Sequence, residues 1–297
     1  MNTVLAELGK RLAERWVTLL VLPGLLYVLA LSAAVVLGHQ SPHGVESLTD
    51  RVESAAAYLD GRPATTVLVL LGALLAAAAA GLLAQAVAGL VERSWTEPWA
   101  RRPLRWLGDA LAQRRADAWD RAQTDFLRAR DAAGSAHPPG EMDDLAERRN
   151  RIALARPVMP TRIGDRMRAV QNRVWRQYGL DLASAWPRLW LVVDDGTRQT
   201  VSAARRGFDA ATLLTAWGAL YAALASLCWP AAGIGAVIAV MGVRRGRRAA
   251  AVLADTVEAV VDLHHRDLAR TLGVLPDDEP YTSMVGRRIT EQLRKGT

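Results

Sequence analysis

The sequence is poor in cysteine, lysine and phenylalanine, with one Cys, two Lys and two Phe among 297 residues. A single cysteine, Cys228, excludes an intrachain disulfide and a cage of thiolate metal ligands. The basic residues are almost all arginine, and together with the abundance of Ala and Gly this composition is typical of a high-GC bacterial genome. No stretch shows the alternating pattern of a half-buried strand, which favours an all-α fold.

Motifs that carry chemistry are also missing. The sequence has no phosphate-binding loop, no nucleophile elbow and no paired metal ligands. Apart from Asp209 at the very start of one apolar stretch, Gln85 is the most polar residue within these stretches, which argues against a relay of ions or protons through a helix bundle. The sequence therefore identifies no catalytic residue, no metal site and no cofactor, and an enzyme is the weakest of the functional hypotheses.

What the chain does have is a set of apolar stretches at 17–37, 63–91, 208–229 and 231–243. The first contains 21 uncharged residues, just enough to cross a hydrocarbon core of about 30 Å. Basic residues before it make a signal peptide the alternative, but the run is longer than an ordinary signal core. The fourth stretch is short, so re-entrant insertion is its alternative, although the turn at Trp229 and Pro230 favours a hairpin.

Basic residues orient these stretches. All but two of the 37 Lys and Arg residues, Arg51 and Arg62, fall on segments that one topology places on the same side. Loops rich in Lys and Arg stay in the cytoplasm. The sequence thus predicts an all-α integral membrane protein with four transmembrane helices and both termini in the cytoplasm of a bacterial cell. Its parts are 1–92 with two spans and the outer loop 38–62, the cytoplasmic helical region 93–207, the transmembrane hairpin 208–243 and cytoplasmic C-terminal helices 244–297.

Small residues recur at helical spacing within the spans. Ala76, Ala80, Ala84 and Ala88 share one face of the second span. Similar rows occupy the two arms of the hairpin, at Gly218, Ala222 and Ser226 and at Ala231, Gly235 and Ala239. Small side chains allow helix backbones to approach closely in lipid, so these rows predict packing seams within the chain or between copies of it.

The region between the second and third spans has helical periodicity, with helices expected over 101–130, 141–156 and 161–178. In the third, Ile163, Met167, Val170, Val174 and Tyr178 form an apolar stripe, whereas Arg162, Arg166, Arg173 and Arg176 form a basic face. This face is a candidate site for anionic lipid or a cytoplasmic protein partner. The alternative is an ordinary helix that buries its apolar stripe against neighbouring helices and exposes its arginines to water. Nucleic acid is disfavoured because no reading motif accompanies the arginines.

A second candidate surface follows the second span, where Trp95, Trp99 and Trp106 are interleaved with Arg101, Arg102 and Arg105. Tryptophan and arginine at the end of a span are typical of a membrane interface. We expect the tryptophans to form an interfacial belt and the arginines to bind lipid or a partner.

Beyond residue 178, Gly179 should end one helix and Asp181 should begin the next, in which Trp186 and Trp190 share a face. Asp194 and Asp195 precede a glycine and are interpreted as a turn and helix cap. Helices are then expected over 247–273 and 282–295. His264 and His265 lie in the first of these, and adjacent helical positions point about 100° apart, so a structural role is favoured over metal binding.

Four short segments carry a resemblance, namely Pro160-Thr161-Arg162-Ile163-Gly164, Tyr178-Gly179-Leu180-Asp181, Trp186-Pro187-Arg188-Leu189 and Asp262-Leu263-His264-His265-Arg266. In these the chain from residue 157 onward resembles uncharacterised actinobacterial multi-pass membrane proteins, a resemblance that implies no activity. The leading hypothesis is a membrane-embedded scaffold or anchor whose Arg-rich helices dock a partner or anionic lipid. The alternative is a self-associating channel or pore-forming effector, which would require a homo-oligomer.

Overall fold

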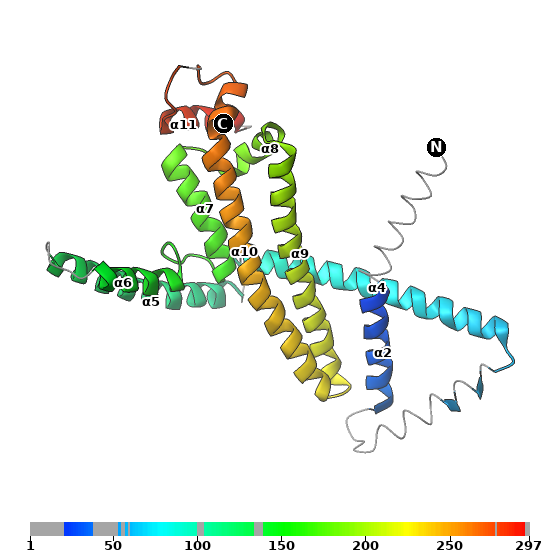
Figure 1. Ribbon diagram of the computed structural model, residues 1–297. Helices are drawn as coiled ribbons and strands as arrows, with labels where there is room; N and C mark the ends of the chain where they lie inside the picture. The colour runs from blue at the N-terminus through cyan, green and yellow to red at the C-terminus, as the bar shows by residue number, and fades with distance from the viewer. Residues whose placement is uncertain are drawn as a thin grey trace, which may run out of the picture. The chain divides into compact units, whose positions relative to one another are not determined.

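The computed structural model describes residues 21–37, 53–54, 57–58, 60–99, 104–133, 139–276 and 278–294, and all regular structure in them is helical (Figure 1). The expectation of an all-helical chain is confirmed for these residues. The helices are α2 (Leu22–Leu37), α4 (Pro63–Thr96), α5 (Leu104–Ala133), α6 (Pro139–Ile152), α7 (Arg162–Tyr178), α8 (Leu182–Val192), α9 (Asp195–Ala223), the 3-10 helix η2 (Leu224–Ser226), α10 (Pro230–Thr271) and α11 (Ser283–Leu293).

The chain forms two compact units, each assembled from two separate stretches of sequence. The first unit contains Met1–Val91 and Ala211–Arg244, and the second contains Glu92–Ala210 and Arg245–Thr297. In the second unit, therefore, the two stretches that make one core are separated along the chain by residues of the first.

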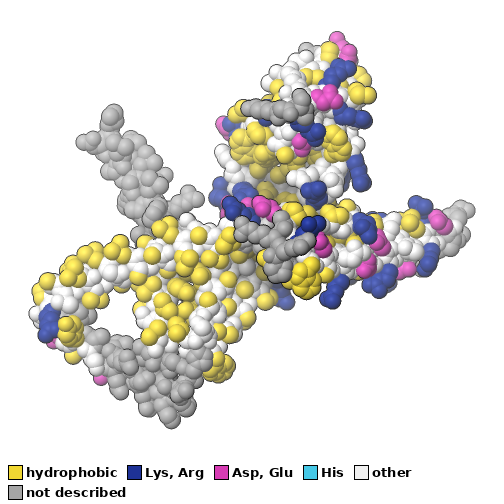
Figure 2. Space-filling model, turned by 180° about the vertical axis from the view of Figure 1, so that it is seen from behind, with side chains coloured by type: hydrophobic (Ala, Val, Ile, Leu, Met, Phe, Trp, Pro, Cys, Tyr) yellow, Lys and Arg dark blue, Asp and Glu magenta, His cyan; other side chains and the backbone are white. Residues whose placement is uncertain are grey.

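The first unit holds the apolar helices. Two helical stretches are long and apolar enough to cross a membrane, Pro63–Thr96 and Asp195–Ser226, and α2 contains a shorter apolar stretch, Leu22–Val35. Hydrophobic side chains cover most of the described surface of this unit on the face shown in Figure 2. Five consecutive residues of α4, from Val67 to Leu71, are each at least half exposed. Consecutive residues cannot share one face of a helix, so this part of α4 is apolar all round.

The seam on α4 is present, shifted by one residue at its first position. Ala80, Ala84 and Ala88 are buried as expected, but Ala76 is exposed and Ala77 is buried instead. α2 comes so close here that a Cβ on Gly24 would overlap the backbone carbonyl of Ala77. Farther along, Ala80 and Ala84 pack with Trp217 of α9, and Tyr27 of α2 packs against the same cluster.

α9 and α10 form the expected hairpin, and their small residues interlock. A Cβ on Gly218 would overlap the backbone of Ala239, and a Cβ on Gly235 would overlap that of Ala222. The two helices thus approach backbone to backbone at these two glycines, so the small-residue rows predicted on the two arms pack against each other within the chain. α10 then continues to Thr271 as one helix of 42 residues, whereas two helices meeting near Arg244 were expected. No proline interrupts this stretch, so its helical hydrogen bonds continue.

The second unit is built on a core shared by α7, α8, α9, α10 and α11 (Figure 1). Its most completely buried side chains are Val174, Leu180, Leu189, Val193, Val261, Leu268 and Ile289. α7 contributes Val170 and Val174 of its apolar stripe to this core, with Met167 and Tyr178 packed against it. α11 closes the core from the C-terminal end of the described chain.

Local caps fix the ends of α7 and the start of α8. The Thr161 hydroxyl oxygen accepts a hydrogen bond from the Gly164 amide at 2.9 Å and begins α7. Gly179 ends α7 with φ of 69°, in the left-handed region that favours glycine, and Asp181 then caps α8. Thr290 of α11 donates to the Gly179 carbonyl at 3.1 Å and accepts from the Asp181 amide at 3.0 Å. α11 is thereby fastened to the turn between α7 and α8.

α5 and α6 lie side by side as an antiparallel pair (Figure 1). The Trp119 ring nitrogen donates to the Ala153 carbonyl at 3.0 Å, and Arg156 binds the Asp120 carboxylate through two nitrogens at about 3.0 Å. α6 ends at Ile152, four residues before its expected end.

Candidate functional site

The basic face of α7 is divided between internal ion pairs and exposed side chains. Arg166 forms an ion pair with Asp255 of α10, and Arg173 pairs with Glu258 of the same helix at 2.8 Å. Arg162 and Arg176 are exposed. Two of the four predicted binding arginines thus pair with α10, and of these Arg173 remains exposed at the surface together with Arg162 and Arg176.

The apolar stripe of α7 cannot lie in a bilayer while the second unit is folded, because it forms part of the core. Met167 and Tyr178, the partly buried members of the stripe, pack against the same core. The packed-helix alternative therefore describes the apolar side of α7. Only the exposed arginines of this helix are therefore available to contact lipid or a protein partner.

The three tryptophans expected at the membrane interface lie in three different environments. Trp95 is buried, its ring centroid 5.9 Å from that of Phe208, and a Cβ on Gly246 would approach its ring to 2.6 Å. Trp99 is half-buried and its ring nitrogen donates to the Ser94 carbonyl at 2.9 Å. Only Trp106, at 66% exposure, presents its indole to the surroundings. A belt that includes Trp95 is therefore wrong, because that side chain is a core residue.

The arginines beside these tryptophans are only partly described. Arg101 and Arg102 lie outside the described residues. Arg105 is exposed in the first turn of α5, with its Nε 3.7 Å from a carboxylate oxygen of Asp109.

An exposed apolar surface that the sequence analysis missed lies at the start of α5. Leu104, Trp106, Leu107 and Leu111, which we call the α5 patch, are between 37% and 66% exposed. At 100° per residue the three leucines fall within an arc of about 60°, and Trp106 points about 100° away from Leu107, the nearest of them. On the next turns the exposed charged residues Arg114, Asp117 and Arg121 point between the directions of Leu107 and Trp106. The spacing of the leucines inside a helix that was expected is the signal that could have revealed the patch.

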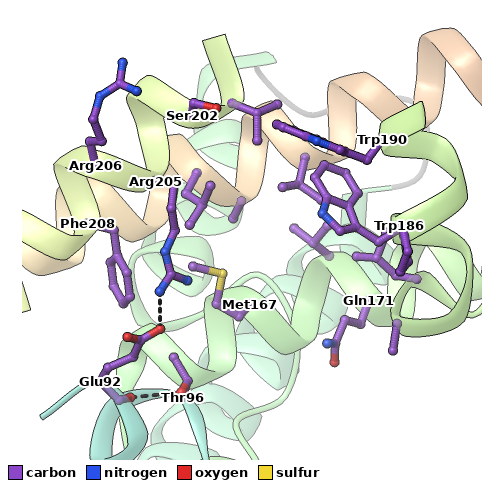
Figure 3. A pocket seen from close by; sticks show the side chains of 18 residues that line it. Glu92, Thr96, Met167, Gln171, Trp186, Trp190, Ser202, Arg205, Arg206 and Phe208 are labelled. Atoms are coloured by element: carbon purple, nitrogen blue, oxygen red, sulfur yellow. Dashed lines mark hydrogen bonds and ion pairs between the residues drawn. The ribbon is translucent and has the colours of Figure 1, made fainter. Parts of the chain in front are cut away.

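The second unit also contains a pocket of about 1000 Å³, lined by residues of α7, α8, α9, α10 and the last turns of α4 (Figure 3). Most of its lining is apolar and includes Met167, Trp186, Trp190 and Phe208. The indole centroids of Trp186 and Trp190 lie 5.9 Å apart, which confirms that they share a face of α8. Sequence periodicity alone gave no sign of the pocket, since its walls come from distant segments.

Charged residues line only one end of this pocket. Arg205 donates to a carboxylate oxygen of Glu92 at 2.6 Å and contacts Asp209 at 2.8 Å. The Thr96 hydroxyl donates to the Glu92 carbonyl at 2.9 Å. Arg206 also lines the pocket and is exposed. Figure 3 places the Arg205–Glu92 pair at one side of the pocket and the two indoles at the other.

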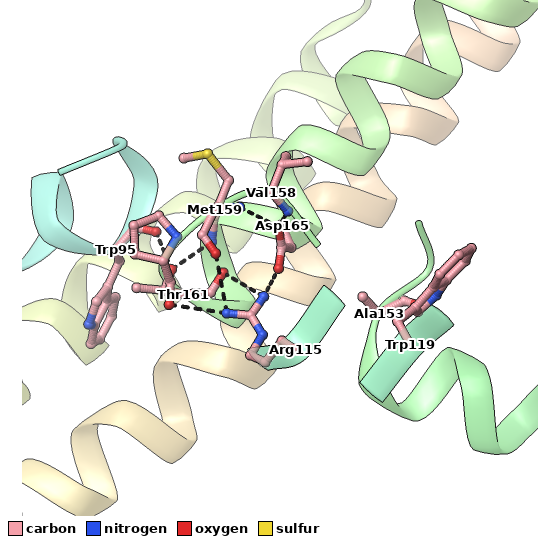
Figure 4. Close-up of polar contacts among 10 residues, drawn as sticks. Trp95, Arg115, Trp119, Ala153, Val158, Met159, Thr161 and Asp165 are labelled. Carbon is pink, nitrogen blue, oxygen red and sulfur yellow. Dashed lines mark hydrogen bonds and ion pairs between the residues drawn. The ribbon is translucent and has the colours of Figure 1, made fainter. Parts of the chain in front are cut away.

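A separate polar cluster joins α5 to the start of α7 (Figure 4). Arg115 forms an ion pair with Asp165 and donates to the carbonyls of Met159 at 3.3 Å and Pro160 at 3.1 Å. Asp165 also accepts from the amides of Val158 and Met159, each at 2.9 Å. Burial, with nearby Arg162 and Arg247, lowers the pKa of Arg115. This cluster fixes the segment 158–161, so we regard it as structural.

The acidic and histidine residues singled out in the sequence also have structural partners. Asp194 accepts hydrogen bonds from the hydroxyl and the amide of Thr197, which lower the pKa of its carboxyl to about 2 and cap α9. His265 lies between two tyrosine rings, 4.4 Å from the centroid of Tyr178 and 4.6 Å from that of Tyr281. His264 contacts Asp267 at 3.2 Å.

The described residues contain no group of three or more His, Cys, Asp or Glu side chains that could hold a metal ion. No protein-family model, curated protein or solved structure matches the chain. The α5 patch, the exposed arginines of α7 and the pocket are therefore the surfaces from which a function has to be argued.

Proposed function

We propose that this protein is a membrane-anchored scaffold whose cytoplasmic helical unit docks on anionic lipid or on a protein partner. Apolar helices hold it in a bacterial cell membrane, with four spans at 17–37, 63–91, 208–229 and 231–243. Both termini and the second unit lie in the cytoplasm, on the side that carries nearly all of the arginines.

The observation that carries the membrane part of the proposal is the exposure of α4. From Val67 to Leu71 no residue is charged and each side chain is at least half exposed. In water such a surface would be costly, at about 25 cal/mol for each Å² of apolar area, whereas lipid tails are as apolar as leucine. The environment that suits this helix is the interior of a bilayer.

The docking part of the proposal rests on the α5 patch. Its first leucine, Leu104, lies eight positions after Thr96 at the end of α4, so the chain between them spans at most about 28 Å. An arc of exposed leucines, with Trp106 and Arg105 exposed on the same two turns, suits the boundary between headgroups and acyl chains. The apolar surface ends after two turns, where the exposed Arg114 and Asp117 point between the directions of Leu107 and Trp106.

The small-residue seams do not favour the alternative of a self-associating pore. Ala239 and Ala222 of the same chain occupy the space beside Gly218 and Gly235, and Ala80 and Ala84 pack against Trp217. Seams that are occupied within one chain give no surface to a second copy.

Cysteine accessibility tests the topology in the full-length chain. In a Cys228→Ser background, Asp60→Cys should react with a membrane-impermeant maleimide in intact cells, and Asp125→Cys should react only after permeabilisation. Both aspartates are exposed, so accessibility within the protein is matched. Equal labelling of the two sites in intact cells would refute the topology.

Hydrogen exchange tests the docking surface. In nanodiscs that contain phosphatidylglycerol, side-chain insertion should slow amide exchange over residues 104–111 relative to discs of phosphatidylcholine alone. Residues 118–128 of the same helix, beyond the patch, serve as the internal control. If protection over 104–111 is the same in both discs and unchanged by Leu107→Asp, the patch does not dock on anionic lipid.

A further inference from the structure

We infer that the pocket of the second unit binds a long-chain anionic amphiphile, with its aliphatic chain against Trp186 and Trp190 and its single negative charge beside Arg206. The inference goes beyond the scaffold proposal and does not depend on the topology, because every residue that lines the pocket belongs to the second unit. The chemical class of the ligand follows from size, lining and charge.

Size and lining favour an aliphatic ligand. A volume of about 1000 Å³ lies at the upper end of the range for sites that bury a drug-sized molecule. The indoles of Trp186 and Trp190 and the thioether of Met167 are polarisable and apolar, and they present no charged group to a ligand. A hydrocarbon chain gains free energy on leaving water for such a surface and needs no hydrogen-bond partner there.

The distribution of charge favours an anionic head at one end. Of the residues that line the pocket, only Glu92, Arg205 and Arg206 are charged. Glu92 and Arg205 pair with each other, which leaves the exposed Arg206 as the cation that could meet a carboxylate or phosphate. A polyphosphate ligand such as a nucleotide would require several uncompensated cations, so a single negative charge fits this end better.

The polar and apolar ends lie on opposite sides of the pocket, as Figure 3 shows for the Arg205–Glu92 pair and the two tryptophans. A ligand that satisfies both ends must itself be apolar over most of its length and charged at one terminus. Free fatty acids and anionic phospholipids share this chemistry, and the experiment has to distinguish these two sources.

Photolabelling of the purified full-length protein tests the inference. A diazirine analogue of palmitic acid, bound to the protein in nanodiscs of phosphatidylcholine, is activated and the modified residues are mapped by mass spectrometry. We expect modification of the segment 182–190 and of Met167. Excess palmitate should reduce it about tenfold, and octanoate should compete much less, because each buried methylene contributes about 0.8 kcal/mol.

Two variants test the two ends of the site. Ala183 is exposed and lines the pocket, so Ala183→Trp should obstruct it without disturbing the core and reduce labelling at least fivefold. Ala203 is exposed on α9 and does not line the pocket, so Ala203→Trp is the matched control and should label like the wild type. Arg206→Gln should remove the preference for palmitate over its uncharged methyl ester while leaving some labelling by the chain.

Competition with phosphatidylglycerol identifies the source of the ligand. Displacement by this lipid at lower concentration than palmitate assigns the site to a phospholipid, and the reverse assigns it to a free fatty acid; either result supports the inference. Labelling that Ala183→Trp does not reduce, or that spreads over the exposed leucines of α4 alone, overturns it. Equal competition by palmitate and its methyl ester in the wild type overturns the assignment of an anionic head.

Discussion

Gly218 of α9 lies directly against Ala239 of α10, at a separation that leaves no room for a Cβ on residue 218. Gly207 lies on the same helix, and a Cβ added there would meet no neighbouring side chain or backbone within 4 Å. The two glycines therefore allow a matched test of close packing in this hairpin.

Gly218→Ala should lower the free energy of unfolding by about 1–3 kcal/mol, because the methyl group forces the two backbones apart. Gly207→Ala should raise it by about 0.5–1 kcal/mol, since alanine favours a helix interior over glycine. Thermal unfolding in detergent measures both. A stabilised Gly218→Ala variant would show that the hairpin is not packed at this point.

The one-residue shift of the seam on α4 gives a second matched pair. Ala80→Leu should overpack the cluster that Ala80 forms with Ala84 and Trp217, and lower the melting temperature. Ala76→Leu should leave the melting temperature almost unchanged because Ala76 is exposed. Equal effects of the two substitutions would contradict the observed register of α4.

The ion pair of Arg115 and Asp165 should be important for stability. Asp165→Asn leaves the mostly buried guanidinium without its counter-charge and should lower the free energy of unfolding by about 3–5 kcal/mol. Arg156→Gln breaks the exposed pair with Asp120 and should change stability little. Chemical denaturation followed by tryptophan fluorescence gives the free energy of unfolding of both variants. Similar decreases in the two variants would mean that burial does not make the Arg115–Asp165 pair more important than the exposed pair.

Tyr178 makes the stability of the second unit sensitive to alkaline pH. Burial, with the hydrogen bond to Asp262, raises the pKa of the Tyr178 phenol from 10.0 to about 12. The protonated phenol is thus favoured in the folded state, so its contribution is complete below pH 10 and is lost as the pH rises to 12. The difference in tyrosinate absorbance at about 295 nm between wild type and Tyr178→Phe should have its midpoint near pH 12. A midpoint near pH 10 would rule out this environment.

The parts of the fold that local sequence determines were predicted well. Gly179 ends α7 and Asp181 caps α8, as expected, through bonds to residues a few positions away. Thr161 caps α7 in the same local way, although it was expected to lie inside the helix. The hairpin at Trp229 and Pro230 and the rows of small residues on its two arms were also expected, although the pairing of Gly218 with Ala239 comes from the structure. These features depend on short distances along the sequence.

Features set by distant residues were missed or misplaced. Residues 76–80 are five consecutive alanines, so α2 and α9, rather than the sequence of α4, decide which alanine is buried. The arginines next to Trp95 in the sequence suggest an interfacial tryptophan. In the structure, the missing side chain of Gly246 leaves room for the Trp95 indole in the core. The pair of Arg115 and Asp165, like the pocket, joins segments that no periodicity relates.

The division of the second unit into two stretches of sequence has a consequence for biosynthesis. Ile289 of α11 is completely buried in a core whose first helices, α7 and α8, precede the hairpin of the first unit. α7 and α8 leave the ribosome long before α11 does. Their apolar faces therefore remain exposed while the hairpin is synthesised. Completion of the core therefore has to follow synthesis of both the hairpin and α11, and a nascent chain that stops before residue 289 leaves an open surface for chaperones and proteases to recognise.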